Sequence, residues 1–149
     1  MLDNRIFTGY LLSMSELQSY KQLIVWQKSM DLVEMIYKIT DSFPKSELYG
    51  LISQIRRSAV SIPSNIAEGY GRTSPKDYGQ FYTIAYGSLL ELETQLTISY
   101  RLGFVIKQEL DQIFSLIEEI SKMLHVMILR TKKLDPNSKL SPKSYLTKN

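Results

Sequence analysis

Apolar residues recur at spacings of three and four along most of the chain, a pattern typical of helices that bury one face. Over residues 23–40, Trp26, Met30, Val33 and Tyr37 follow this spacing. A second stretch of alternating four- and three-residue spacings covers residues 46–66. No segment alternates between apolar and polar residues clearly enough to predict a strand.

The third predicted helix covers residues 74–102 and has clear signals at both ends. Ser74 is a suitable N-cap, Pro75 suits the first helical position, and Asp77 follows three residues after the cap. Gly103 comes directly after the last residue of the pattern, where a glycine commonly ends a helix.

The fourth predicted helix covers residues 107–134 and ends before Pro136. No Ser, Thr, Asp or Asn cap precedes it, so its first residue is the least defined of the four starts. Because the links between these helices are only a few residues long, consecutive helices must be antiparallel neighbours. The sequence therefore predicts an all-α protein, an up-down-up-down antiparallel four-helix bundle.

The bundle domain is expected to comprise residues 20–135. Residues 1–19 are expected to be a flexible N-terminal extension and residues 136–149 a basic flexible tail. Met14 is as good a start as Met1, because the patterned chain begins only near residue 20. No apolar run approaches the roughly 20 residues that cross a membrane, and there is no cysteine. We expect a cytoplasmic protein that does not enter a membrane.

The segment from residue 54 to 72 breaks several helix rules. Pro63 lies inside an otherwise helical pattern, which predicts either a kink or a new turn that starts there. Glu68 lies near the negative end of the helix dipole, so we expect Arg72 or Lys76 to pair with it. We interpret the segment as a structural corner that leads into the third helix, with four residues that define it: Pro63, Asn65, Glu68 and Gly69.

The third helix carries more apolar surface than one core stripe needs. Beside the core stripe, Tyr78, Tyr82, Tyr86 and Leu90 form a second stripe of residues four apart. We predict that this stripe is an interface between copies of the chain, since large apolar patches are uncommon on monomers. A wide core and a platform for stacking bases are the alternatives. Gly87 lies in the same region, where a close approach by another helix would explain a glycine.

The net charge is only +3, but the positive charges are unevenly placed. Six bases and one acid lie between residues 130 and 149. Adjacent arginines in the second helix and bases near the corner add to a hypothetical phosphate-binding set, whereas surface salt bridges are the alternative use of these side chains. The proposed set is Arg56, Arg57, Arg72, Lys76, Lys132 and Lys133.

Enzyme chemistry finds little support in the residues. The single histidine, His125, has Lys122 three positions before it, so the Glu-x-x-His pairs of a di-metal bundle are missing. A nucleophile elbow and a P-loop are missing too. We expect a protein without catalytic residues, metal or cofactor.

Several segments together resemble one known family, the 23S rRNA intervening-sequence protein family, also called the S23 or four helix bundle protein family. They are "YKQLIVWQKSMDLV", "FPKSELYGLISQIRRSAVSIPSNIAEGYGR", "SPKDYGQFYTIAYGSLLELETQL" and "RLGF". The most specific part is "SIPSNIAEGYGR", and the resemblance extends over about residues 20–134.

The resemblance implies a helical bundle that assembles as a barrel-like homopentamer. The family is encoded in insertions within bacterial 23S rRNA genes and at other loci. It is related to the accessory variability protein of diversity-generating retroelements, which works with a reverse transcriptase and its RNA. The implied function is a non-enzymatic pentameric scaffold that binds structured RNA or a ribonucleoprotein. A protein–protein adaptor that touches no nucleic acid is the alternative.

Overall fold

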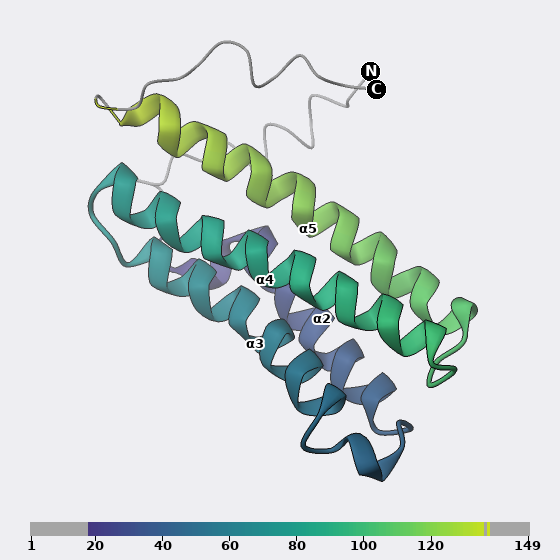
Figure 1. Ribbon diagram of the computed structural model, residues 1–149. Coiled ribbons are helices and arrows are strands. Elements are labelled where there is room, and N and C mark those ends of the chain that lie inside the picture. Colours follow the sequence, from purple (N-terminus) through teal and green to yellow (C-terminus); the bar gives the residue numbers. More distant parts are fainter. Residues whose placement is uncertain (1–17, 136, 138–149) are drawn as a thin grey trace, which may run out of the picture.

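A computed structural model describes residues 18–135 and 137 of the 149-residue chain. Four long helices account for most of them (Figure 1). These helices are α2 (Ile24–Thr40), α3 (Leu51–Tyr70), α4 (Pro75–Arg101) and α5 (Lys107–Leu134), and two short 3-10 helices are η1 (Tyr20–Gln22) and η2 (Lys45–Glu47). The described residues include no strand. Nearly all of the predicted N-terminal extension and basic tail lies outside the described residues.

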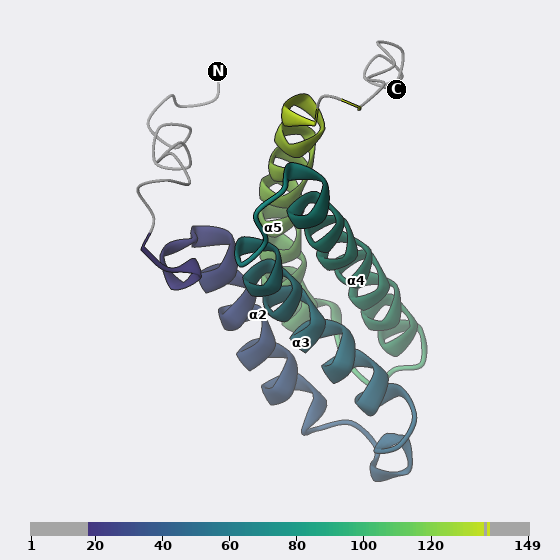
Figure 2. The ribbon, with the colours of Figure 1, turned by 90° about the vertical axis from the view of Figure 1, so that its left-hand side faces the viewer.

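The four helices form a closed square of antiparallel neighbours. Contacts join α2 to α3, α3 to α4, α4 to α5, and α5 back to α2, while the two diagonal pairs make none (Figure 2). Each link reverses the chain direction, so the predicted up-down-up-down bundle is confirmed for the described residues. The core lies along the axis of this square and is built mainly from aliphatic side chains of all four helices.

The predicted core positions are right for α3 and shifted for α2. On α3, Ile55, Ile62 and Ile66 are completely buried, as the spacing predicts. On α2 the buried positions are one residue away from the stripe that begins at Trp26, so Met30 and Tyr37 remain exposed. The α3 helix also begins later than predicted, because residues 45–47 form η2 instead.

Pro63 lies within α3 without ending it. The helix continues to Tyr70, so the alternative of a new turn that starts at Pro63 is wrong. Proline removes one N–H from the helix ladder and crowds the carbonyl four residues earlier. Nearby side chains add hydrogen bonds to the same turn. The Ser64 hydroxyl donates to the Val60 carbonyl at 2.8 Å, and the Asn65 amide donates to the Ser61 carbonyl at 2.8 Å.

Gly69 is required by packing. A Cβ at this position would lie 2.7 Å from Cε1 of Tyr82 and 3.1 Å from Cβ of Phe81. Its φ angle is not positive, since Gly103 alone among the described residues has a positive φ, of 75°. The place of Gly69 in the predicted structural corner is therefore explained by close packing and not by a positive φ. Its missing side chain lets the first turns of α4 pack against the last turn of α3.

Tyr82 fills the space beside Gly69 and is 2 % exposed. The prediction that it lies on a surface between copies is therefore wrong, and the wide-core alternative is right at this position. Its hydroxyl has no hydrogen-bond partner among the described residues. Burial, followed by the nearby Tyr78 and Tyr70, raises the pKa of Tyr82 from 10.0 to about 12.

Replacing Tyr82 with phenylalanine should make the protein less sensitive to alkaline pH. Because the folded pKa is above the unfolded one, the native state holds this proton more tightly, and the associated stability is lost as pH rises from 10.0 to about 12. We expect Tyr82→Phe to avoid a loss of about 2 kcal/mol across that window. At neutral pH it should gain up to about 1 kcal/mol, since it no longer buries an unpaired hydroxyl.

Urea unfolding at neutral pH and at several pH values between 10.0 and 12 measures both effects. Tyr78→Phe is the matched control, because Tyr78 is half-buried. A Tyr82→Phe protein that is less stable at neutral pH, and loses stability at high pH as the parent does, would contradict the described burial.

Candidate nucleic-acid interface

Several helix ends meet at one end of the bundle, which we name the corner end. It consists of η1, the last turns of α3 and α5, and the first turn of α4. The Tyr20 and Tyr70 ring centroids lie 6.3 Å apart, which places η1 against the end of α3. A Cβ on Gly79 would overlap the Thr131 side chain, so α4 and α5 also approach closely here. Figure 1 shows the α3–α4 link and the end of α5 on the same side.

The corner end gathers four of the six bases in the predicted phosphate-binding set. Lys76 is exposed in the first turn of α4, and Lys132 and Lys133 are exposed in the last turn of α5. Arg72 is exposed in the α3–α4 link, two residues after α3 ends, and we include this link in the corner end. The described acids nearby are Glu68, Asp77 and Asp135, and all three accept local hydrogen bonds.

The sequence interpretation missed Lys21, which η1 adds to the corner end. Its side chain is exposed, while the ring of the preceding Tyr20 packs on Trp26 and Tyr70. The signal available in the sequence was the capping pair Ser19 and Gln22. The Ser19 hydroxyl accepts from the Lys21 amide at 3.2 Å, and the Gln22 side chain accepts from the Ser19 amide at 3.3 Å.

Arg72 has two partners within its own corner. It donates to Glu68 at 2.9 Å, which confirms the predicted cationic partner for that acid. Its guanidinium also lies over the Phe81 ring, 4.7 Å from the centroid. The side chain remains 46 % exposed. Because a guanidinium carries five N–H donors, Arg72 can still reach an anion while it stacks on Phe81.

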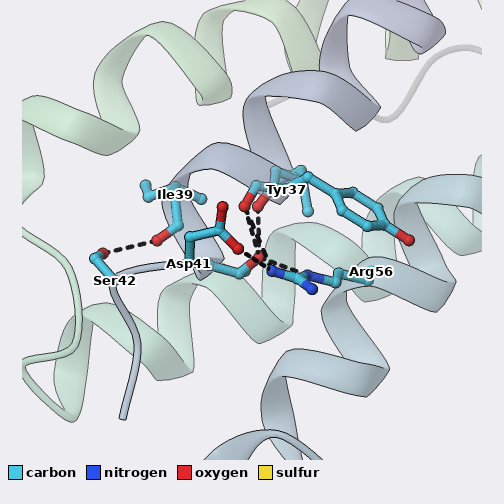
Figure 3. A network of polar contacts seen from close by, with 7 residues as sticks. Tyr37, Ile39, Asp41, Ser42 and Arg56 are labelled. Carbon is cyan, nitrogen blue, oxygen red and sulfur yellow. Dashed lines mark hydrogen bonds and ion pairs between the residues drawn. The ribbon is translucent and has the colours of Figure 1, made fainter. Parts of the chain in front are cut away.

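Arg56 lies outside the corner end, and its contacts hold α3 against α2. Its NH2 donates to Asp41 at 2.7 Å, its Nε donates to the Thr40 hydroxyl at 2.8 Å, and its guanidinium lies 4.5 Å from the Tyr37 ring centroid (Figure 3). These contacts tie the middle of α3 to the end of α2. The salt-bridge alternative for Arg56 is therefore confirmed, and a contact of this side chain with phosphate stays a prediction.

Arg57 is exposed and makes no ion pair with the described residues. It lies thirteen positions before Tyr70, which corresponds to roughly 20 Å along α3 from the corner end. The adjacent arginines therefore do not act as a pair, and neither of them adds to the bases at the corner end.

The sides of the bundle carry mainly acids. Lys28 pairs with Glu119 at 2.6 Å, and Lys122 pairs with Glu118 at 2.6 Å, a hydrogen bond that lowers the pKa of Glu118. Exposed acids occupy the middle parts of three helices: Asp31, Glu34, Glu91, Glu93, Glu118 and Glu119. The exposed side chains along these middle parts are therefore more acidic than those of the corner end.

The predicted interface stripe on α4 does not form one surface. Tyr78 is half-buried with its ring 6.0 Å from that of buried Tyr82, and Tyr86 is half-buried with its ring 6.5 Å from His125. Leu90 is 44 % exposed, as expected for an interface residue. The apolar residues that α4 does expose along its outer side are Ile84, Leu90 and Ile98, with Gly87 between them.

The residues that the structure describes were considered for a metal site and for a membrane-spanning helix. They include no group of three or more His, Cys, Asp or Glu side chains that could hold a metal ion. None of their helices combines the length and the apolar character needed to cross a membrane.

Known proteins resemble this chain in both sequence and structure. A crystal structure of a protein with unknown function from the S23 ribosomal protein family of Bacteroides thetaiotaomicron is similar to this chain. The two share 27 % sequence identity with a TM-score of 0.64, over 70 % of this chain and 98 % of that one. No curated protein matches. Residues 21–126 match the model of the family described as 23S rRNA-intervening sequence protein, and the chain therefore belongs to that family.

Proposed function

We propose that the protein is a non-enzymatic, cytoplasmic scaffold that binds structured RNA at its corner end. The observation that carries the proposal is the excess of exposed bases there over acids, with further acids along the sides: the bases are Lys21, Arg72, Lys76, Lys132 and Lys133, and the acids are Glu68, Asp77 and Asp135. Such a distribution attracts a phosphate backbone to one end and fixes its approach. The family relationship supports RNA as the polyanion.

The bases that contact phosphate are Lys21, Arg72, Lys76, Lys132 and Lys133. The aromatic side chains among them, Tyr20, Tyr70 and Tyr78, are all partly buried. Binding of unpaired bases relies on exposed rings for stacking. We therefore propose that the corner end contacts the backbone of paired RNA and shows little sequence preference.

Assembly into a homopentamer would multiply this weak site. In a cyclic ring every copy has the same orientation, so side-by-side bundles would present all of their corner ends on one rim. Several modest sites on one rim bind a long polyanion far more tightly than one site does.

The apolar outer side of α4 is our proposed contact between copies. Gly87 lies mid-helix in this surface, yet a Cβ placed on it would meet nothing within 4 Å in the isolated chain. Glycine costs about 1 kcal/mol relative to alanine in such a position, so packing within the chain does not explain it. A helix of a neighbouring copy that approaches closely would.

Removing the corner-end lysines should weaken RNA binding and its salt dependence. The combined variant is Lys21→Gln, Lys76→Gln, Lys132→Gln and Lys133→Gln. The slope of log affinity against log salt should fall by about one for each phosphate that the missing lysines no longer neutralise. Fluorescence anisotropy with a labelled RNA hairpin at several salt concentrations measures it.

The control removes the same number of positive charges at the opposite end of the bundle: Lys38→Gln, Lys45→Gln, Arg101→Gln and Lys107→Gln. Its salt slope and affinity should stay close to those of the parent. Equal weakening in both variants would mean that RNA responds to net charge alone, and unchanged binding in both would remove RNA from the corner end.

Enlarging Gly87 should separate the copies without unfolding them. Gly87→Gln places a long side chain where the isolated chain has open space, so the bundle should remain folded. We expect light scattering to show a smaller particle, with unchanged helical circular dichroism. Ser115→Gln, on the exposed side of α5, should leave assembly intact. A parent protein that is monomeric at micromolar concentration, or a Gly87→Gln particle of parental size, would contradict this interface.

A protein adaptor without RNA remains a second candidate because of one feature at the opposite end. In the link after η2, Tyr49 is 95 % exposed and Leu48 is 47 % exposed. Exposed apolar side chains of this size are suited to a protein partner such as a reverse transcriptase. If purified protein carries no nucleic acid at low salt and shows no shift with added RNA, the adaptor is favoured.

A further inference from the structure

Arg72 differs from the lysines of the corner end because the fold holds its side chain from two sides. Beyond the last residue of α3, the Gly71 amide donates to the Ala67 carbonyl at 3.3 Å. The Arg72 amide donates to the Gly69 carbonyl at 3.1 Å. These bonds continue the coil past the helix end, so Arg72 stands one turn beyond Glu68. Its NH2 group donates to Oε1 of Glu68 at 2.9 Å.

The ring of Phe81 supports the same guanidinium from the first turns of α4. The Cζ atom of Arg72 lies 4.7 Å from the ring centroid, where the electron-rich face of the ring attracts a cation. The close packing at Gly69 makes room for this ring, since a Cβ on the glycine would lie 3.1 Å from Cβ of Phe81. The end of α3 therefore holds one edge of the guanidinium, and α4 holds one of its faces.

The contact with Glu68 leaves one complete fork of the guanidinium for a ligand. A guanidinium presents two forks, one formed by Nε and NH2 and one by NH1 and NH2, and NH2 contributes one hydrogen to each. The bond to Glu68 uses one hydrogen of NH2, and no other side chain of the described residues accepts from Arg72. Because the side chain is 46 % exposed, the second fork is open to a ligand from solvent.

A phosphate group matches this fork. Two of its oxygens accept two parallel N–H bonds from a guanidinium, a geometry that a lysine does not provide. The carboxylate of Glu68 repels a phosphate from the first fork and leaves the second for it. In paired RNA the major groove is too deep and narrow for side chains to read, so phosphate is the accessible partner.

We propose that Arg72 binds one phosphate of paired RNA through its free fork and thereby fixes the register of the RNA backbone on the corner end. Phe81 and Glu68 are the positioning residues of this contact. The proposal rests on the RNA binding proposed above and separates two contributions to it. The corner-end lysines attract the backbone as point charges on flexible stems, whereas Arg72 orients it.

The proposal also gives a role to the end of the segment that is most specific to the family resemblance. The sequence "EGYGR" covers residues 68–72. It supplies the carboxylate that holds one edge of the guanidinium, the glycine that admits the Phe81 ring, and the arginine itself. The three parts act together only because the chain turns back on itself between α3 and α4.

Arg72→Lys tests the fork without changing the net charge. We expect affinity for a labelled RNA hairpin, measured by fluorescence anisotropy, to fall about tenfold, as for the loss of one charge-assisted hydrogen bond. The slope of log affinity against log salt should stay parental, because the number of charges is the same. Lys133→Arg is the reverse exchange at a position without such support and should leave affinity and slope unchanged. Parental affinity in Arg72→Lys, or an equal change in Lys133→Arg, would overturn the proposal.

Phe81→Leu tests whether the ring acts through the guanidinium. It should weaken RNA binding in the parent and have no further effect in an Arg72→Lys background, because the ring then has no guanidinium to hold. Phe114→Leu removes another half-buried ring, two turns after the start of α5, and should leave affinity unchanged. Equal effects of Phe81→Leu in both backgrounds would show that the ring supports the fold alone and would overturn its positioning role.

A second RNA identifies the group that the fork binds. With a duplex of adenine and uracil only, Arg72→Lys should lose as much affinity as with a hairpin that contains guanine. A loss confined to guanine-containing RNA would assign the fork to a base edge and overturn the phosphate contact.

The combined lysine variant described above retains Arg72 and separates this inference from the proposed function. If that variant binds RNA as the parent does, or the parent binds none, RNA does not use the corner end and both proposals fail. If it binds more weakly while Arg72→Lys binds as the parent does, the inference about Arg72 alone fails.

Discussion

The contact between the Tyr82 ring and the backbone of Gly69 positions α4 on α3 and, with it, the bases of the corner end. It draws the first turns of α4 onto the last turn of α3, and the chain reverses between Tyr70 and Pro75. Because α4 starts at that place, Lys76 stands beside the end of α5, where Lys132 and Lys133 are exposed. The absence of a side chain at Gly69 allows α4 to pack against α3 in the way that forms the corner end.

The second organising feature is the distribution of charged side chains over the surface of the folded bundle. Acids along the sides are partly neutralised by neighbouring lysines, as in the Lys28–Glu119 and Lys122–Glu118 pairs. Arg56 is used in tying α3 to α2 through Asp41, Thr40 and Tyr37. Exposed bases remain at both ends of the bundle, and at the corner end they outnumber the described acids. A net charge of +3 is therefore compatible with a local polyanion site, since the distribution matters more than the sum.

Local patterns were sufficient to predict the four helices, their antiparallel order and several of their ends. The Ser74 cap and the positive φ of Gly103 are both where the sequence places them. The start of α5 was undefined because Glu109 accepts from the Ile106 amide at 3.1 Å, a cap that needs no polar residue before the helix. The fates of Arg56 and Tyr82 could not be predicted, because each depends on a partner on another helix. The spacing of the tyrosines along α4 is the same whether or not a glycine on another helix leaves room for one of their rings. The spacing alone therefore does not predict which ring is buried.

The most direct test of this account is the stability of Gly69→Ala relative to Gly71→Ala in urea unfolding. At Gly69 the new Cβ must displace the Tyr82 ring, which costs about 1–3 kcal/mol. Better helix propensity returns at most about 1 kcal/mol, so the net loss is up to about 2 kcal/mol. At Gly71 the nearest atom would be 3.5 Å away and φ is −75°, so alanine fits. The account predicts a clear loss of stability for Gly69→Ala and little change for Gly71→Ala. A Gly69→Ala protein as stable as the parent would show that the corner does not depend on this contact.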